Sequence, residues 1–161
     1  MKHLLILSLL LAVARADDNW PAFPVEWNKT GSSPADVSFL LKPANDRITV
    51  KDGHLVRGDG SRFRIWGINA TGQAGLPATN AAPIIAARLA TLGINCVRFH
   101  FLDKPGTLIA GDRDDTRALD PNAFARLDRF VFELKQHGIY SDLNLNVYLS
   151  LIHISEPTRP Y

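Results

Sequence analysis

Polar side chains recur near the carboxyl ends of three apolar runs in this 161-residue chain. These side chains are Asn69 in the first run, Arg98, His100 and Asp103 at and just after the end of the second, and Asn144 and Asn146 in the third. Alternate residues of a strand share a face, and polar groups buried without partners are costly. They must therefore bond one another or line a wet cavity. We expect Asn69, Arg98 and Asn146 to point toward a common polar mouth.

Arg98 is the most informative of these residues. Its guanidinium lies between two apolar neighbours, Val97 and Phe99, and a guanidinium in such surroundings needs a carboxylate partner that it can hold in two parallel hydrogen bonds. An arginine in this role keeps a nucleophilic carboxylate ionised. The alternative is that Arg98 lies at a sheet edge and reaches into water.

The amides and the histidine suit a ligand that carries hydroxyl groups. Asn69 and Asn146 offer both donors and acceptors, as sugar hydroxyls require. We expect the amide of Asn144 to satisfy backbone groups instead. His100 and Asp103 have two interpretations that remain open: they bind sugar hydroxyls, or they brace the loop that follows them.

The elements that must position these residues alternate between strand and helix. We predict strands at Gly67 to Asn69, Ile94 to Phe101 and Ile139 to Val147, and helices from Ala81 to Leu92 and from Asp120 to the glycine at 138. This order is typical of parallel sheets. The loops after the strands are long and the turns after the helices short, which places a site at the carboxyl ends of the strands. The predicted fold class is α/β, the first three βα units of a (β/α)₈ barrel, with a doubly wound sheet as the alternative.

Two segments precede these units. Residues Asp17 to Asp46 show no sustained periodicity and predict an irregular lead-in. Three short β-prone runs between Ile48 and Ile65 are separated by Asp52-Gly53 and Asp59-Gly60. Asp-Gly pairs favour tight hairpin turns, so we expect a β-hairpin here. The predicted N-terminal part of the barrel, with the hairpin included, spans residues 47–147.

The first 16 residues, Met1 to Ala16, have a basic start, an apolar run and a small-x-small end, as in a signal peptide. The apolar run is too short to cross a bilayer, so we expect a secreted or periplasmic protein with no membrane partner. Without Lys2 and Arg15 of this leader, the 18 basic side chains fall to the number of acidic ones, 16. No basic cluster suggests nucleic acid.

The sequence predicts neither a cofactor nor a metal. The stretch Gly67 to Gly75 lacks the G-x-G-x-x-G spacing of a dinucleotide site, which argues against an oxidoreductase, and the histidines lack metal-ligand spacing. Cys96 is the single cysteine, so no internal disulfide can form. We interpret Cys96 as a small buried hydrophobe rather than a nucleophile, since no base can be placed beside it.

Four stretches together resemble the opening of a cellulase-like glycoside hydrolase, similar to family 5 and its relatives in clan A. They are DVSFLL (Asp36 to Leu41), ITVKDGHLVRGDGSRFRIWGINATG (Ile48 to Gly72), LATLGINCVRFHFLD (Leu89 to Asp103) and DDTRALDPNAFARLDRFVFELKQHGIYSDLNLNV (Asp114 to Val147). The resemblance implies a secreted (β/α)₈ enzyme that hydrolyses O-glycosidic bonds of a polysaccharide. It also implies that the hairpin caps the closed bottom of the barrel.

The resemblance assigns roles to two residues of this chain. Arg98 matches the family arginine that supports the nucleophile, and Asn146 stands where many relatives have a substrate-contacting histidine. The family's catalytic pair is two glutamates, at the ends of the fourth and seventh strands, in a retaining mechanism. Both positions lie beyond the end of this chain, so no catalytic residue is assigned and we expect the chain by itself to be inactive. The alternative is a non-catalytic carbohydrate-binding or scaffold protein on a degenerate barrel.

The last residues have a different character. Residues Leu149 to Arg159, LSLIHISEPTR, resemble the translation of a transposase-type sequencing adapter. Continuing the third strand to Ile154 would also make it far longer than the usual 3–10 residues. We therefore expect residues 148–161 to be a non-native tail and the natural sequence to continue differently from about Tyr148.

Overall fold

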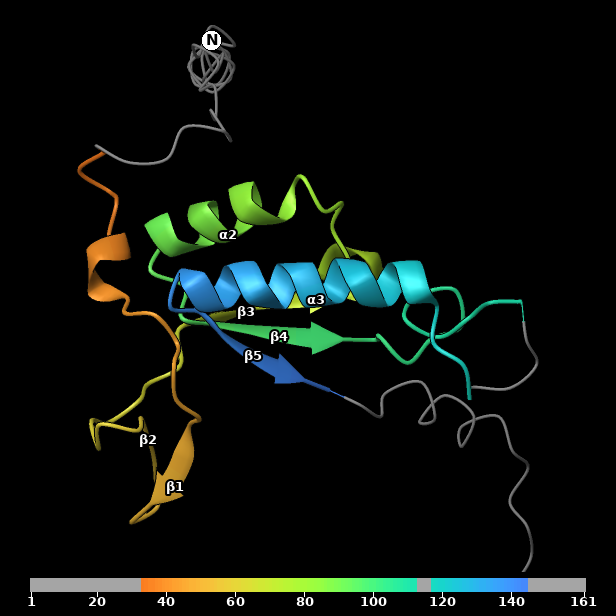
Figure 1. Ribbon diagram of the computed structural model, residues 1–161. Coiled ribbons are helices and arrows are strands. Elements are labelled where there is room, and N and C mark those ends of the chain that lie inside the picture. The colour runs from red at the N-terminus through yellow and green to blue at the C-terminus, as the bar shows by residue number, and fades with distance from the viewer. Residues whose placement is uncertain (1–32, 113–116, 145–161) are drawn as a thin grey trace, which may run out of the picture.

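The computed structural model describes residues 33–112 and 117–144 as a mixed α/β arrangement (Figure 1). In chain order the elements are the 3₁₀ helix η1 (Ser38–Leu40), strands β1 (Thr49–Lys51), β2 (His54–Val56) and β3 (Gly67–Thr71), the 3₁₀ helix η2 (Gly72–Gly75), helix α2 (Ala82–Thr91), strand β4 (Cys96–His100), helix α3 (Pro121–Gln136) and strand β5 (Tyr140–Leu143). The α/β class and the predicted alternation of strand and helix are confirmed.

The central feature is a parallel sheet in the order β3-β4-β5. Its register places Gly67 beside Cys96, and Cys96 beside Tyr140. Helix α2 connects β3 to β4, and α3 connects β4 to β5; Figure 1 shows both helices on the same side of the sheet. One face of the sheet is therefore covered, and the other is not covered by either helix.

The core lies between the sheet and the two helices. Val97 and Phe99 of β4 are fully buried there, and the ring of Phe99 packs edge-on against Phe130 of α3, with 5.9 Å between the ring centroids. Helix α2 contributes small residues to the same core, namely Ala82, Ala86 and Ala90. Small side chains let a helix approach a sheet closely, and buried aromatic rings contribute large apolar areas.

The helices begin and end where the sequence predicts. Asp120 caps α3 by accepting hydrogen bonds from the backbone amides of Asn122 and Ala123, at 2.8 and 2.9 Å. This cap, followed by proline at the first helical position, is typical of a helix start. Gly93 and Gly138 end the two helices with φ values of +71° and +77°. Each then turns the chain directly into the next strand.

The hairpin forms with one difference from the prediction. Asp52 and Gly53 both have positive φ, 52° and 74°, as a type I′ turn requires, and β1 pairs with β2. The third β-prone run, residues 62–65, is not a strand, because it pairs with β2 only at a single bridge between Val56 and Arg62. Instead, its backbone turns toward the sheet, where the side chain of Asn95 accepts from the amide of Trp66 and donates to the carbonyl of Arg64, each at 2.8 Å.

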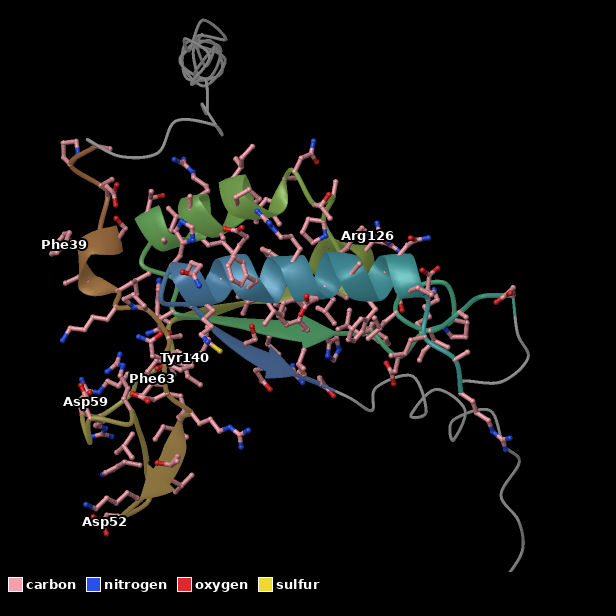
Figure 2. All side chains as sticks on the ribbon, in the orientation of Figure 1. Phe39, Asp52, Asp59, Phe63, Arg126 and Tyr140 are labelled. Carbon is pink, nitrogen blue, oxygen red and sulfur yellow. The ribbon has the colours of Figure 1, made fainter. Side chains whose placement is uncertain are left out.

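An aromatic contact fixes the hairpin at the amino ends of the strands. The rings of Phe63 and Tyr140 meet edge to face, with 5.0 Å between their centroids. Figure 2 labels the two residues, which lie near each other. The guanidinium of Arg57 also lies over the ring of Phe63, with its central carbon 4.9 Å from the ring centroid. Since Tyr140 is the first residue of β5, this end of the sheet is closed by rings and the polar chemistry lies toward the other end.

Several predicted boundaries are corrected by the structure. The strand predicted over 94–101 is β4, and the one predicted over 139–147 is β5, both shorter than expected. Residues 145–147 lie outside the described residues. The loop predicted to follow Asn69 starts later than expected, because the chain first completes β3 and then forms η2. Within its described part, residues 33–46, the lead-in has one short helix, η1, with no buried residue among its three.

The glycines at the helix ends offer a matched pair of tests. A Cβ at Gly138 would lie 2.3 Å from the backbone oxygen of Lys42, whereas a Cβ at Gly93 would meet a side-chain methyl of Val37 at 2.8 Å. Both positions carry the left-handed strain of about 1–2 kcal/mol for a non-glycine residue. Only the backbone contact resists relaxation, so Gly138→Ala is expected to cost about 2 kcal/mol more than Gly93→Ala.

Hydrogen exchange measures this difference locally. The amides of Ile94 and Ile139 follow the two glycines and bond to Leu89 and Leu134 at 3.1 and 2.9 Å. Gly138→Ala should lower the opening free energy at Ile139 by more than Gly93→Ala lowers it at Ile94. Equal losses of opening free energy at the two amides would show that the backbone of Lys42 does not lie against Gly138.

Candidate functional site

The uncovered face of the sheet carries the polar residues in rows. Because side chains alternate along β4, Cys96, Arg98 and His100 lie on the face opposite Val97 and Phe99. Register then aligns them with their neighbours on β3 and β5. We call Asn69, Arg98 and Asp142 the middle row, and Thr71, His100 and Asn144 the outer row, which lies at the carboxyl ends of the strands.

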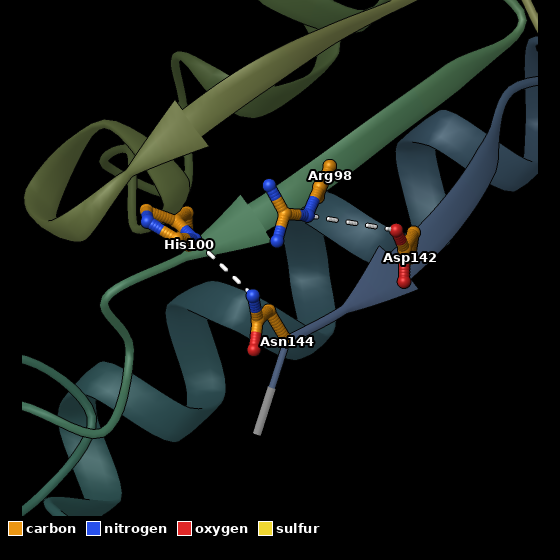
Figure 3. Close-up of polar contacts among 4 residues, drawn as sticks. All are labelled: Arg98, His100, Asp142 and Asn144. Atoms are coloured by element: carbon orange, nitrogen blue, oxygen red, sulfur yellow. Dashed lines mark hydrogen bonds and ion pairs between the residues drawn. The ribbon is translucent and has the colours of Figure 1, made fainter. Parts of the chain in front are cut away.

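An ion pair joins two members of the middle row. Arg98 Nε lies 3.8 Å from Asp142 Oδ2, with the two side chains 43% and 60% exposed (Figure 3). Asn69 is beside Arg98 in the register. The structure thus brings Arg98 to a carboxylate, as its chemistry requires, although this carboxylate was not among the predicted site residues. In such solvent-exposed surroundings the pair contributes at most about 1 kcal/mol to stability, so it orients Arg98 more than it holds the fold.

A second polar contact lies in the outer row. The side-chain amide nitrogen of Asn144 is 3.3 Å from Nδ1 of His100, and the two come from adjacent strand ends (Figure 3). The backbone amide of Asn144 bonds to the carbonyl of Phe99 at 3.0 Å, which continues the β4–β5 pairing to this point. The expectation that the Asn144 side chain satisfies backbone groups is therefore wrong, because it contacts an imidazole instead.

A shallow hollow of about 460 Å³ lies over the middle row. Its lining combines polar groups of Asn69, Arg98 and Asp142 with Trp66 and Ile68 from the β3 side. Trp66 is 66% exposed, so most of its surface is open to a ligand. The volume falls in the range of small-molecule sites, roughly 300–1,000 Å³, and a large ring beside hydrogen-bonding groups suits an amphipathic ligand.

Cys96 lies in the floor of this hollow but is not set up as a nucleophile. Burial, together with the negative charge of Asp142, raises the pKa of the Cys96 thiol. A raised pKa keeps sulfur protonated, whereas nucleophilic cysteines need the opposite shift. The interpretation of Cys96 as a buried, unreactive residue is consistent with this environment, since 7% of it is exposed.

One further predicted site residue within the described part of the chain lies apart from the rows. Asp103 is in the loop after β4, beyond the outer row, and Asn146 lies outside the described residues. The same loop is tied to η2, because Gln73 Nε2 donates to the carbonyl of Gly106 at 2.9 Å. Thr107 Oγ1 also donates to the carbonyl of Leu102 at 2.7 Å. The loops that follow β3 and β4 therefore form one connected rim at the carboxyl ends of the strands.

The described residues contain no group of three or more possible metal ligands. Among residues 33–112 and 117–144, no helix combines the length and the apolar character that a bilayer crossing demands. The middle and outer rows offer a set of hydrogen-bond donors and acceptors along the strands, in which the cation of Arg98 is paired with the carboxylate of Asp142. Such a set can bind and orient a hydroxylated ligand.

The electrostatic effect of Asp142 on the pKa of Cys96 can be tested by thiol reactivity. In Asp142→Asn the carboxylate charge that raises the pKa of Cys96 is gone, so this pKa should fall, while burial still holds it above its ordinary value. At a fixed pH near 8 more thiolate is then present, and alkylation by iodoacetamide should be faster. Asp52→Asn, in the hairpin turn, is the control and should react at the parental rate. An unchanged rate in Asp142→Asn would place its carboxylate away from the hollow.

Comparison with known proteins adds no relative to this geometry. No family model matches the chain, and the searches of curated proteins and of solved structures found no match. The case for a function therefore comes from the middle and outer rows and from the sequence resemblance. Both lead to a proposal that experiment can decide.

Proposed function

We propose that the described residues are the opening three strands of a (β/α)₈ barrel, from an exported glycoside hydrolase that cleaves O-glycosidic bonds of a polysaccharide. The observation that carries the proposal is the middle row. Asn69, Arg98 and Asp142 come from three successive parallel strands and share one face. In barrel enzymes, residues from several strands converge in this way toward the carboxyl-terminal mouth.

The polarity of the uncovered face favours a barrel over a doubly wound sheet. In a doubly wound sheet helices cover both faces, and the strands are apolar on both sides. Here β4 has Val97 and Phe99 under the helices, but Arg98 and His100 on the other side. A closed barrel has its helices outside and admits polar groups near its mouth, so it accommodates this division without burying unpaired charges.

The placement of Arg98 supports the hydrolytic role. A guanidinium held by Asp142 at one nitrogen still has further N–H groups free to donate. In the proposed enzyme, these groups donate to the nucleophilic glutamate and keep it ionised, as the family resemblance implies for this arginine. The amide of Asn69 and the imidazole of His100 lie on the same face and supply hydrogen bonds to sugar hydroxyls.

The test is to recover the natural continuation of the gene and to assay the complete protein. We expect glutamates at the ends of the fourth and seventh strands and release of reducing sugar from a β-linked polysaccharide, with retention at the anomeric carbon. Residues 1–161 alone should release none. Glu→Gln at either position should reduce kcat by about 10³-fold or more, as for removal of other essential groups.

Arg98 provides the discriminating variant within the known sequence. Arg98→Lys keeps the charge but loses the planar fork, so kcat/KM should fall by about 10²-fold, comparable with the loss of one strong donor at a reacting centre. Arg62→Lys, on the hairpin, is the matched control and should retain activity. Binding of polysaccharide without hydrolysis, with no glutamate pair, would support the carbohydrate-binding alternative. A complete protein that neither binds nor hydrolyses polysaccharide would overturn the carbohydrate proposal.

A further inference from the structure

The imidazole of His100 is held from two directions at the end of β4. Asn144 contacts Nδ1 through its amide nitrogen at 3.3 Å (Figure 3). On another side the ring of Phe101 meets the imidazole edge to face, with 4.6 Å between centroids and an interplanar angle of 79°. The ring therefore has a restricted orientation even though His100 is only partly buried.

The backbone that supplies the second contact is strained. Phe101 has a φ of +58°, a region that bulky residues rarely occupy, and a cost of about 1–3 kcal/mol is typical of such residues at functional sites. Thr107 stabilises this turn by bonding its hydroxyl to the carbonyl of Leu102. The strained residue, Phe101, is thus the one whose ring contacts His100, and the hydrogen bond from Thr107 stabilises the loop that follows it.

The contact with Asn144 determines which nitrogen of His100 carries the proton. An amide nitrogen can only donate, so Nδ1 must be the acceptor in this contact. The neutral ring then carries its hydrogen on Nε2. Nε2 is left as a donor with a fixed direction, and its natural partner is an oxygen with a free lone pair.

We propose that His100 binds ligand oxygen through Nε2–H, and that Asn144 and Phe101 are the positioning residues that fix its tautomer and its ring plane. The identification of that oxygen as a sugar hydroxyl rests on the proposed function; the tautomer does not. A neighbouring strand end thereby decides the hydrogen-bonding character of the site, since the same imidazole turned over would present an acceptor to the ligand.

The chain contains an internal reference of the opposite kind. His137, at the end of α3, has Nδ1 2.9 Å from the carbonyl oxygen of Glu133. A carbonyl can only accept, so Nδ1 of His137 must carry the hydrogen. His100 and His137 are therefore expected to be opposite tautomers in the same molecule, and exposed His54 of β2 reports the unbiased ratio.

The experiment is a long-range ¹H–¹⁵N correlation spectrum of the full chain at pH 8.5, or its magic-angle-spinning equivalent on sedimented protein. His→Gln variants assign each ring. Relative to His54, we expect His100 to be enriched in the Nε2–H form by roughly 2- to 10-fold, the bias of one neutral hydrogen bond, and His137 to be enriched in the Nδ1–H form.

Variants of Asn144 separate positioning from simple packing. Asn144→Asp replaces the donor by a group that only accepts, so His100 should switch to the Nδ1–H form, whereas Asn144→Ala should return the ratio to that of His54. Asn122→Asp, on α3, is the matched control and should change nothing. The inference would be overturned if His100 were mainly in the Nδ1–H form in the parent chain, or if Asn144→Asp left its tautomer ratio unaltered.

Addition of cellohexaose and mannohexaose as probes tests the ligand half. Shifts of the His100 Nε2 signal, together with those of Arg98, would support the inference. Shifts at Arg98 without any at His100 would overturn it and leave the proposed function standing. The absence of shifts anywhere in the chain would overturn the sugar contact, whereas the carbohydrate proposal is decided by the assay of the complete protein.

Discussion

The two-residue period of β4 is the constraint on which the rest of the structure depends. This strand is the centre of the parallel sheet, and its residues alternate between fully buried Val97 and Phe99 and the partly exposed Arg98 and His100. A shift of one residue would bury a guanidinium under the helices and expose Phe99. Packing of Phe99 against α3 therefore fixes the register that assembles the polar rows.

The two ends of the sheet have different characters because different sequences close them. At the amino ends, Asn95 and the ring contact between Phe63 and Tyr140 fasten the hairpin with backbone and aromatic interactions. At the carboxyl ends Gln73 joins the loop after β3 to the loop after β4, and Thr107 braces the second loop internally. In parallel α/β barrels the amino-terminal face of the sheet contributes stability and the loops at the carboxyl-terminal face carry the chemistry. The two ends of this sheet differ in the same way.

The elements could be predicted from sequence because their signals are local. Asp120-Pro121 starts α3, glycines end both helices, and Asp52-Gly53 makes the hairpin turn; each depends on a few neighbouring residues. The departure of the third hairpin run from β2 after a single bridge was not predicted, because the side chain that binds its backbone, Asn95, stands some thirty positions along the chain. The lengths of β4 and β5 were overestimated because apolar runs extend beyond the residues that pair, whereas β3 is longer than predicted.

The candidate site was only partly predictable, because its contacts join strands that are distant in sequence. The need of Arg98 for a carboxylate follows from its apolar neighbours, but the choice of Asp142 depends on the register between β4 and β5. Alternation did contain the signal, since Asp142 stands two residues before Asn144. The contact of Asn144 with His100 required knowledge of where β5 ends, and no pattern within either segment reveals it.

The claim that three successive strands direct polar groups to one mouth is tested most directly by an experimental structure of the complete polypeptide. We predict that Asn69, Arg98 and Asp142 line a single cavity closed by further strands, with helices on the outside of the sheet only. Helices packed over both faces of the sheet, or those three side chains dispersed on separate surfaces, would contradict it.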